Sequence, residues 1–159
     1  MSIVVVGMAD YKIARPPDQL MTAGLGSCIG LCVYDPHARI GGMAHVMLPT
    51  SEGMSGSNLM KYADTCVKLM MDELARQGVS KTRLKAKMAG GAQMFTFAGK
   101  NPTMRIGERN AEAVSEQLRK YGIPLLGSDV GGNAGRTITF DVGSGDLHIR
   151  TIKHGEKVI

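Results

Sequence analysis

The sequence predicts an α+β fold, formed by a single domain that spans residues 1–159. Short strand-like segments separated by turn residues fill the first part of the chain, a pattern typical of an antiparallel or mixed sheet. Two long stretches of helical periodicity then interrupt this pattern, and further strand-like segments follow. A chain of this length can bury a substantial core without dividing into separate domains.

Five strands are expected in the first part of the chain, because short apolar segments there are bounded by glycine, proline and aspartate. A loop is expected at residues 15–18, where two prolines fix their own backbone and restrict the residues before them. A glycine-rich run, TAGLGSC at residues 22–28, separates the third strand from the fourth. The expected strands cover residues 3–6, 11–14, 20–22, 29–34 and 42–48.

The first helix is predicted by apolar residues that recur at steps of three and four. Ser55 or Ser57 could cap its start, and Gly78 lies where a glycine commonly ends a helix. The apolar face contains Leu59, Tyr62, Ala63, Cys66, Leu69, Met70 and Leu74.

A second helix is predicted from about residue 108 to residue 121, with Gly122 ending it. Its inward positions are Ala111, Val114, Leu118 and Tyr121. The remaining strands are expected at residues 84–89, 125–130, 137–141 and 147–152, the last two forming a hairpin across residues 143–145. Long helices inside a strand-rich chain are typical of an α+β domain.

Composition excludes several classes of protein. No apolar run approaches the roughly 20 residues of a membrane-spanning helix, so direct membrane insertion is not expected. The start of the chain lacks the basic segment of a signal peptide, and we expect a cytoplasmic protein. The net charge of +5 favours acidic partners, but aromatic residues make up only 4% and tryptophan is absent. A base-stacking surface for nucleic acid is therefore not expected.

The three cysteines, Cys28, Cys32 and Cys66, predict neither a disulfide framework nor a metal site. Their odd number and wide spacing fit a reducing compartment. A zinc site would need closely spaced pairs of ligands, which the sequence lacks. No cofactor is expected either, because the glycine-rich run departs from the dinucleotide-binding pattern at Ile29 and no phosphate-binding loop is present. Cys32 and Cys66 lie in apolar patterns and are expected in the core.

Cys28 is the candidate nucleophile, because it ends the glycine-rich run at the mouth of a strand. A turn there would expose its sulfur, and the N–H groups near Ser27 and Cys28 could stabilise an oxyanion. The alternative interpretation is that Cys28 is a small buried hydrophobic residue, as most cysteines are.

His45 is the candidate general base, since an imidazole near a thiol can accept its proton. It lies in an apolar segment, so it could equally be a hydrogen-bonded core histidine. Thr22 precedes Cys28 by six residues, and the turn could bring its hydroxyl beside His45 to orient the ring. The alternative for Thr22 is an ordinary β-branched strand residue.

Basic residues alternate at Lys81, Arg83, Lys85 and Lys87, which could place them on one face of a strand. They would then form a docking surface for an acidic partner. The alternative is a solvated edge strand that its lysines protect from aggregation.

The chain resembles the CheD family, the chemoreceptor glutamine deamidases of bacterial and archaeal chemotaxis. The similarity extends over nearly the whole chain, in the family's order, and is specific only when its segments are taken together. The matching segments are LGSC (25–28), AHVMLP (44–49), KYAD (61–64), AGGA (89–92), IGERN (106–110), GGN (131–133) and GR (135–136).

The resemblance implies a catalytic set of Cys28, His45 and Thr22. It implies an α-β-β-α layered fold, like that of the catalytic domain of cytotoxic necrotizing factors. It implies hydrolysis of selected glutamine side chains on methyl-accepting chemoreceptors, which yields glutamate. The mechanism that we expect is acyl transfer through a Cys28 thioester, with release of ammonia. For some members it also implies a complex with the phosphatase CheC.

Two other functions remain open from the sequence. A receptor methylesterase would use the same thiolate on a glutamyl methyl ester and release methanol. A binding regulator would dock onto CheC or the receptor, and the chemistry of Cys28 would then be secondary.

Overall fold

The computed structural model describes residues 1–53, 58–93 and 105–159, which form two five-stranded sheets and two α-helices. The helices are α1 (Ala63–Arg76) and α2 (Ile106–Tyr121), and the short 3-10 turns are η1 (Leu59–Lys61) and η2 (Lys81–Arg83). The strands are β1 (Ile3–Val5), β2 (Asp10–Ala14), β3 (Gln19–Leu25), β4 (Ile29–Asp35), β5 (Ile40–Val46), β6 (Lys85–Gly90), β7 (Leu125–Val130), β8 (Arg136–Asp141), β9 (Leu147–Thr151) and β10 (Gly155–Val158).

The ten described strands are divided between two sheets, and strands that follow one another in the sequence do not always belong to the same sheet. One sheet has the order β2-β5-β4-β6-β7, and we call it the helix-covered sheet. The second sheet has the order β1-β3-β8-β9-β10. Antiparallel pairs predominate in both, with parallel pairs only at β1–β3 and β6–β7 among the named strands. The mixed, largely antiparallel sheet expected from the sequence is therefore confirmed.

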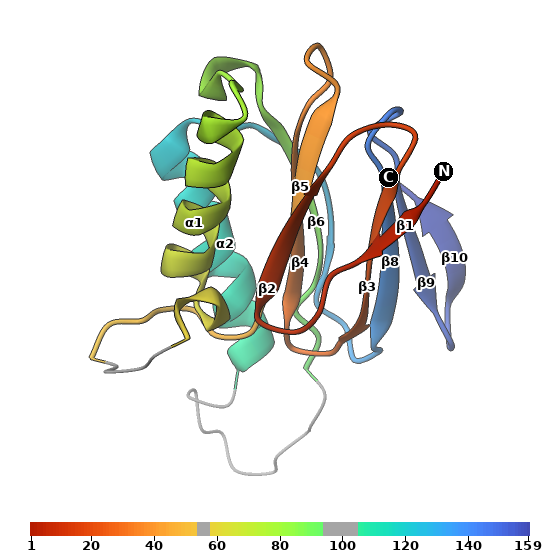
Figure 1. Cartoon of the computed structure of the whole chain (residues 1–159). Coiled ribbons are helices and arrows are strands. Elements are labelled where there is room, and N and C mark those ends of the chain that lie inside the picture. Colours follow the sequence, from red (N-terminus) through yellow and green to blue (C-terminus); the bar gives the residue numbers. More distant parts are fainter. Residues whose placement is uncertain (54–57, 94–104) are drawn as a thin grey trace, which may run out of the picture.

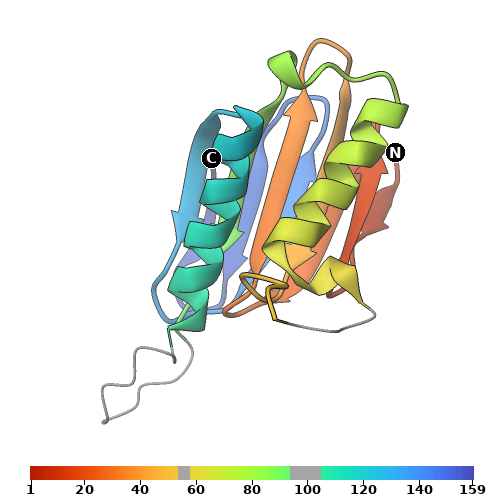
Figure 2. The same cartoon turned by 90° about the vertical axis from the view of Figure 1, so that its left-hand side faces the viewer.

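The layers are helices, helix-covered sheet and second sheet (Figure 1). Figure 2 shows α1 and α2 lying side by side across the same face of one sheet. The α+β class and the packing of two sheets are confirmed. Both described helices cover one face, so the described residues show the layer order α-β-β, with no second helical layer among them.

Two apolar cores lie on the two sides of the helix-covered sheet. Alternate residues of β4, such as Ile29, Leu31 and Val33, face the helices. The intervening residues, such as Cys32 and Tyr34, face Ile138 and Phe140 of the second sheet. Every residue of β4 and β5 is buried, because apolar layers cover both faces of these strands.

Most predicted elements are present at or near their expected ends. Residues 125–130 form β7, and the β8–β9 hairpin is antiparallel. Gly78 and Gly122 follow the helices in left-handed conformations, with φ of +87° and +70°. The first helix begins only at Ala63, so Leu59 precedes it within a 3-10 turn. Ser55 and Ser57, the expected caps, lie outside the described residues.

The basic residues expected on one strand are divided between two elements. Lys81 and Arg83 belong to η2, whereas Lys85 and Lys87 belong to β6. The edge-strand interpretation is wrong, because β6 lies between β4 and β7. Lys87 is half-buried and donates hydrogen bonds to the carbonyls of Gly145 (2.6 Å) and Ile159 (2.9 Å). It is therefore not part of an exposed basic surface.

In the part of the chain that the structure describes, none of the helices has the length and apolar character of a membrane-spanning segment.

Candidate active site

The glycine-rich run passes from one sheet to the other. Residues 19–25 form β3 of the second sheet, and β4 of the helix-covered sheet begins at Ile29. The β3–β8 register shifts between Thr22 and Leu25, so the chain bends before it crosses. Cys28 is the last residue of this crossing, and its side chain lies in the core between the sheets with 9% of its surface exposed.

A neighbouring loop fixes the backbone of Cys28. The N–H of Gly91 donates to the Cys28 carbonyl (2.9 Å), and the N–H of Ala92 donates to the Gly26 carbonyl (2.8 Å). A Cβ atom added at Gly90 would lie 2.1 Å from the Cys28 carbonyl oxygen, and Gly90 has a φ of +121°. Only glycine permits this approach and this backbone conformation together.

Thr22 and His45 come from different sheets and meet between them. Thr22 Oγ1 lies 2.8 Å from His45 Nδ1, and both side chains are 0% exposed. The Thr22 hydroxyl also lies 2.7 Å from the carbonyl oxygen of Val6, which can only accept. A hydroxyl has a single hydrogen, so it donates to Val6 and accepts from His45. The proton of neutral His45 is therefore assigned to Nδ1, and Nε2 has the free lone pair.

Cys28 and His45 lie on the same face of the helix-covered sheet. His45 is directly opposite Gly30 in the β4–β5 ladder, and Cys28 is two residues before Gly30. The two side chains are therefore diagonal neighbours, whose Cα atoms in an antiparallel pair are about 7–8 Å apart. The buried Nε2 atom of His45 finds no hydrogen-bond partner in the part of the chain that the structure describes. A thiol on this face could supply one.

Burial sets the charge states of the pair. It raises the pKa of the Cys28 thiol above its ordinary value of 9.0. It lowers the pKa of His45 below 6.5, because the imidazolium would lose its hydration. At neutral pH the resting pair is thus a thiol and a neutral imidazole. This is the state in which His45 can act as a general base.

Two contributors to the site escaped the sequence analysis as individual residues. Val6 supplies the carbonyl that orders the Thr22 hydroxyl. Asn110 of α2 is fully buried, and its Nδ2 donates to the carbonyls of Ser27 and Met47, each at 2.9 Å. Asn110 precedes Val114 by four residues, so a polar residue at an inward helix position was the available signal.

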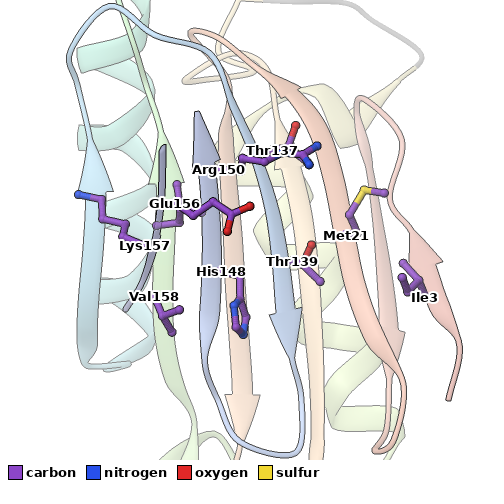
Figure 3. A pocket seen from close by; sticks show the side chains of 10 residues that line it. Ile3, Met21, Thr137, Thr139, His148, Arg150, Glu156, Lys157 and Val158 are labelled. Atoms are coloured by element: carbon purple, nitrogen blue, oxygen red, sulfur yellow. The ribbon is translucent and has the colours of Figure 1, made fainter. Parts of the chain in front are cut away.

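A recess on the outer face of the second sheet is separate from this site (Figure 3). Its volume is about 340 Å³, and its lining includes Thr139, His148 and Glu156 but neither Cys28, His45 nor Thr22. In residues 1–53, 58–93 and 105–159, no group of three or more His, Cys, Asp or Glu side chains is arranged to hold a metal ion.

Comparison with known proteins identifies the family. The family model described as CheD chemotactic sensory transduction matches residues 47–151. A protein from Desulfitobacterium hafniense (strain DSM 10664 / DCB-2), named probable chemoreceptor glutamine deamidase CheD, is 62% identical over 158 residues, which is 99% of each chain. This chain belongs to the CheD family. The matched range of the model begins after Cys28 and His45, whereas the relative is aligned over 99% of this chain.

Other members of the CheD family are similarly close. The chemoreceptor glutamine deamidase CheD of Bacillus subtilis (strain 168) is 50% identical over 159 residues, which is 99% of this chain and 96% of that protein. Among solved structures, the hypothetical protein YfiH of Bacillus licheniformis superimposes with a TM-score of 0.51 at 14% identity. The match covers 78% of this chain and 51% of that one, and shows similarity of fold alone.

Proposed function

We propose that this chain deamidates selected glutamine side chains of chemoreceptors, with Cys28 as nucleophile, His45 as general base and Thr22 as the residue that orients His45. Membership of the CheD family, whose close relatives are named chemoreceptor glutamine deamidases, supports the reaction. The observation that supports these residue roles best is the Thr22–His45 hydrogen bond, which leaves Nε2 free on the face shared with Cys28.

The reaction begins with a proton transfer. His45 Nε2 accepts the thiol proton of Cys28, and the thiolate attacks the amide carbon of the substrate glutamine. The resulting oxyanion collapses as the His45 imidazolium gives its proton to the departing nitrogen, so ammonia leaves and a thioester remains. Water then attacks the thioester with His45 again as base. Glutamate is released, and the proton returns to the Cys28 sulfur.

Backbone N–H groups of the crossing loop are the candidate oxyanion donors. No hydrogen bond between described residues uses the N–H of Ser27 or Cys28, so both are free for the substrate. The neighbouring N–H groups are occupied, because Gly26 donates to the Gly24 carbonyl (3.1 Å) and Gly91 to the Cys28 carbonyl. Two adjacent free donors beside the nucleophile fit the stabilisation of a tetrahedral oxyanion.

The deciding experiment incubates the purified chain with a chemoreceptor cytoplasmic fragment. Ammonia release and conversion of glutamine to glutamate are followed by peptide mass spectrometry. Wild type should convert specific glutamines, and Cys28→Ala should convert none while keeping its thermal unfolding midpoint. Cys66→Ala, which removes a buried thiol elsewhere, should retain conversion. Full conversion by Cys28→Ala would refute the role of Cys28.

The same experiment separates the other candidate functions. Methanol release from a methylated receptor without ammonia release would favour an esterase. Receptor binding without any conversion would favour a regulator. We further propose that the chain acts in the cytoplasm as a single domain. Binding of the phosphatase CheC remains a prediction, tested by adding CheC to the deamidation reaction and measuring the rate.

A further inference from the structure

Asn110 ties together the chain segments that present Cys28 and His45. Its side chain is fully buried in the first part of α2, a helix that packs on the opposite face of the sheet from both candidate catalytic residues. Its Nδ2 donates to two main-chain carbonyls, those of Ser27 and Met47, each at 2.9 Å.

These two carbonyls lie where the β4–β5 ladder ends. The last registered pair is Ile29 with Val46, and Ser27 and Met47 lie just beyond it. The Met47 N–H turns away and donates to the carbonyl of Lys61 (2.9 Å), so the ladder does not continue. The Asn110 carboxamide therefore connects two strand ends that have lost their own cross-strand partners.

The hydrogen-bond partners determine which end of the Asn110 amide faces the two carbonyls. Both partners are carbonyl oxygens, which only accept, so the nitrogen of the amide must face them. Its Oδ1 is buried and finds no partner among the described residues. An unpaired buried carbonyl is costly, whereas an apolar residue would avoid that cost but would leave the Ser27 and Met47 carbonyls without this donor. The feature that distinguishes the amide here is therefore the link that it makes between the two strand ends.

Close packing of the start of α2 against the loop at Gly91 and Ala92 places Asn110 beside the two carbonyls. A Cβ atom added at Gly107, three residues earlier, would lie 2.4 Å from the Gly91 carbonyl oxygen and 2.5 Å from that of Ala92. The start of α2 thus rests directly on the loop whose N–H groups hold Gly26 and Cys28. The helix, this loop and the crossing form one connected unit beneath the nucleophile.

We infer that Asn110 is a positioning residue, which sets the distance between Cys28 and His45 by clamping the carbonyls of Ser27 and Met47. The inference rests on the proposed function, in which these two side chains exchange a proton. Without the clamp the two strand ends are no longer joined to each other, and each keeps only its own hydrogen bonds, from Gly91 and Ala92 to the crossing and from Met47 to Lys61. Cys28 then moves relative to a base that the Thr22 hydrogen bond still holds.

The test uses Asn110→Leu, which keeps the side-chain size and removes both donors. We expect kcat for receptor deamidation to fall roughly a hundred-fold, as for a misplacement of about 1 Å, with a much smaller change in KM. A second readout is the pH dependence of Cys28 alkylation by iodoacetamide, measured in the folded protein. We expect the Asn110→Leu profile to match that of His45→Ala, because both variants uncouple the thiol from the imidazole.

The matched control is Asp35→Ala, at the opposite end of the same strand pair. Asp35 is buried and accepts the N–H groups of His37 (2.8 Å) and Ala38 (3.0 Å) in the β4–β5 turn. Asp35→Ala should lower the midpoint of thermal unfolding and leave the pH profile of Cys28 alkylation as in wild type. Asn110→Leu with lowered stability but the wild-type profile and kcat would overturn the inference. The alkylation readout needs no receptor, so an inactive wild type would refute the deamidase and leave the positional claim separately testable.

Discussion

At the scale of single residues, two neighbours without an acid–base role, Val6 and Thr22, set the orientation and the tautomer of the candidate base His45. The Val6 carbonyl fixes the Thr22 hydroxyl, and Thr22 fixes the proton of His45 on Nδ1. A neutral acceptor at Nδ1 stabilises the imidazolium less than a carboxylate would. His45 therefore depends on Thr22 for orientation and tautomer rather than for charge.

Thr22→Val should show this dependence. It preserves the shape of the side chain but leaves Val6 and Nδ1 unpaired in the core, costing about 1–3 kcal/mol of unfolding free energy. Deamidation should fall by at least about ten-fold, because the ring can then adopt the wrong tautomer. Thr22→Ser, which retains the hydroxyl, is the control in kinetic and urea-unfolding measurements. Equal rates for the valine and serine variants would contradict the assigned role.

The decrease of kcat/KM at acid pH should reflect the burial of His45. Its lowered pKa keeps the imidazole neutral to lower pH than in a free histidine. The acid limb of kcat/KM should therefore be centred below pH 6.5. Rates measured from about pH 5 to pH 9 would show it. An acid limb of kcat/KM at or above the ordinary histidine pKa would argue that His45 is solvated in the free enzyme.

Buried thiols should limit stability at alkaline pH. Burial raises the pKa of Cys66 from 9.0 to about 12, so the unfolded chain releases this proton first. Above pH 9.0 the folded state binds more protons than the unfolded state, and the free energy of unfolding should fall as pH rises. Urea midpoints across this range test the expectation. Cys66→Ala should decline less steeply with pH than wild type.

At the scale of elements, three segments that pack closely against one another hold the candidate nucleophile in place. The crossing between β3 and β4, the residues after β6 and the start of α2 approach to distances at which added side-chain atoms would collide. Arg136 of β8 reinforces this region, since it donates to the carbonyls of Gly90 (3.1 Å) and Gly131 (2.9 Å) and pairs with Asp129.

Gly90→Ala should displace the Cys28 backbone. The added methyl would meet a carbonyl oxygen rather than a movable side chain, and the φ of +121° is unfavourable for alanine. We expect a loss of about 3 kcal/mol or more and strongly reduced deamidation. Gly78→Ala is the control, because its φ of +87° is also positive but its surroundings are open. It should cost only about 1–2 kcal/mol and leave activity intact.

At the scale of the whole molecule, the site exists only while the two sheets are packed together. Thr22 belongs to the second sheet, and His45 belongs to the helix-covered sheet. The two sheets approach each other closely at Gly30, where the absence of a side chain leaves room for the second sheet. A Cβ atom added there would lie 2.4 Å from Ile138 Cδ1.

The spacing between the sheets can be tested with a double-mutant cycle. Gly30→Ala alone should destabilise the protein by about 1–3 kcal/mol through overpacking. Ile138→Val alone removes the opposing methyl and should cost about 0.5–1.5 kcal/mol. Together they should cost less than the sum, by about 1 kcal/mol, because the removed methyl makes room for the added one. Strict additivity in urea unfolding would show that the sheets do not meet at Gly30.

Local patterns predicted most elements, since alternating and helical periodicity reports burial directly. β10 was missed because all its residues are exposed and no alternation marks them. Periodicity also predicted an exposed Lys87, on either a docking surface or a solvated edge strand, since it cannot show that a second sheet covers that face of β6. The contacts of Asn110 could not be predicted from the sequence, because its carbonyl partners lie 83 and 63 residues away along the chain.

Under the proposed residue roles, the division of Thr22 and His45 between two sheets also makes deamidation depend on the correct assembly of both sheets. A collapsed intermediate can contain every helix and strand and still lack the inter-sheet contact that orients the imidazole. Such an intermediate would hold an ordinary unactivated cysteine. With the roles proposed for Cys28, His45 and Thr22, deamidation should therefore require the completed tertiary structure, and copies in such an intermediate state should not modify glutamines.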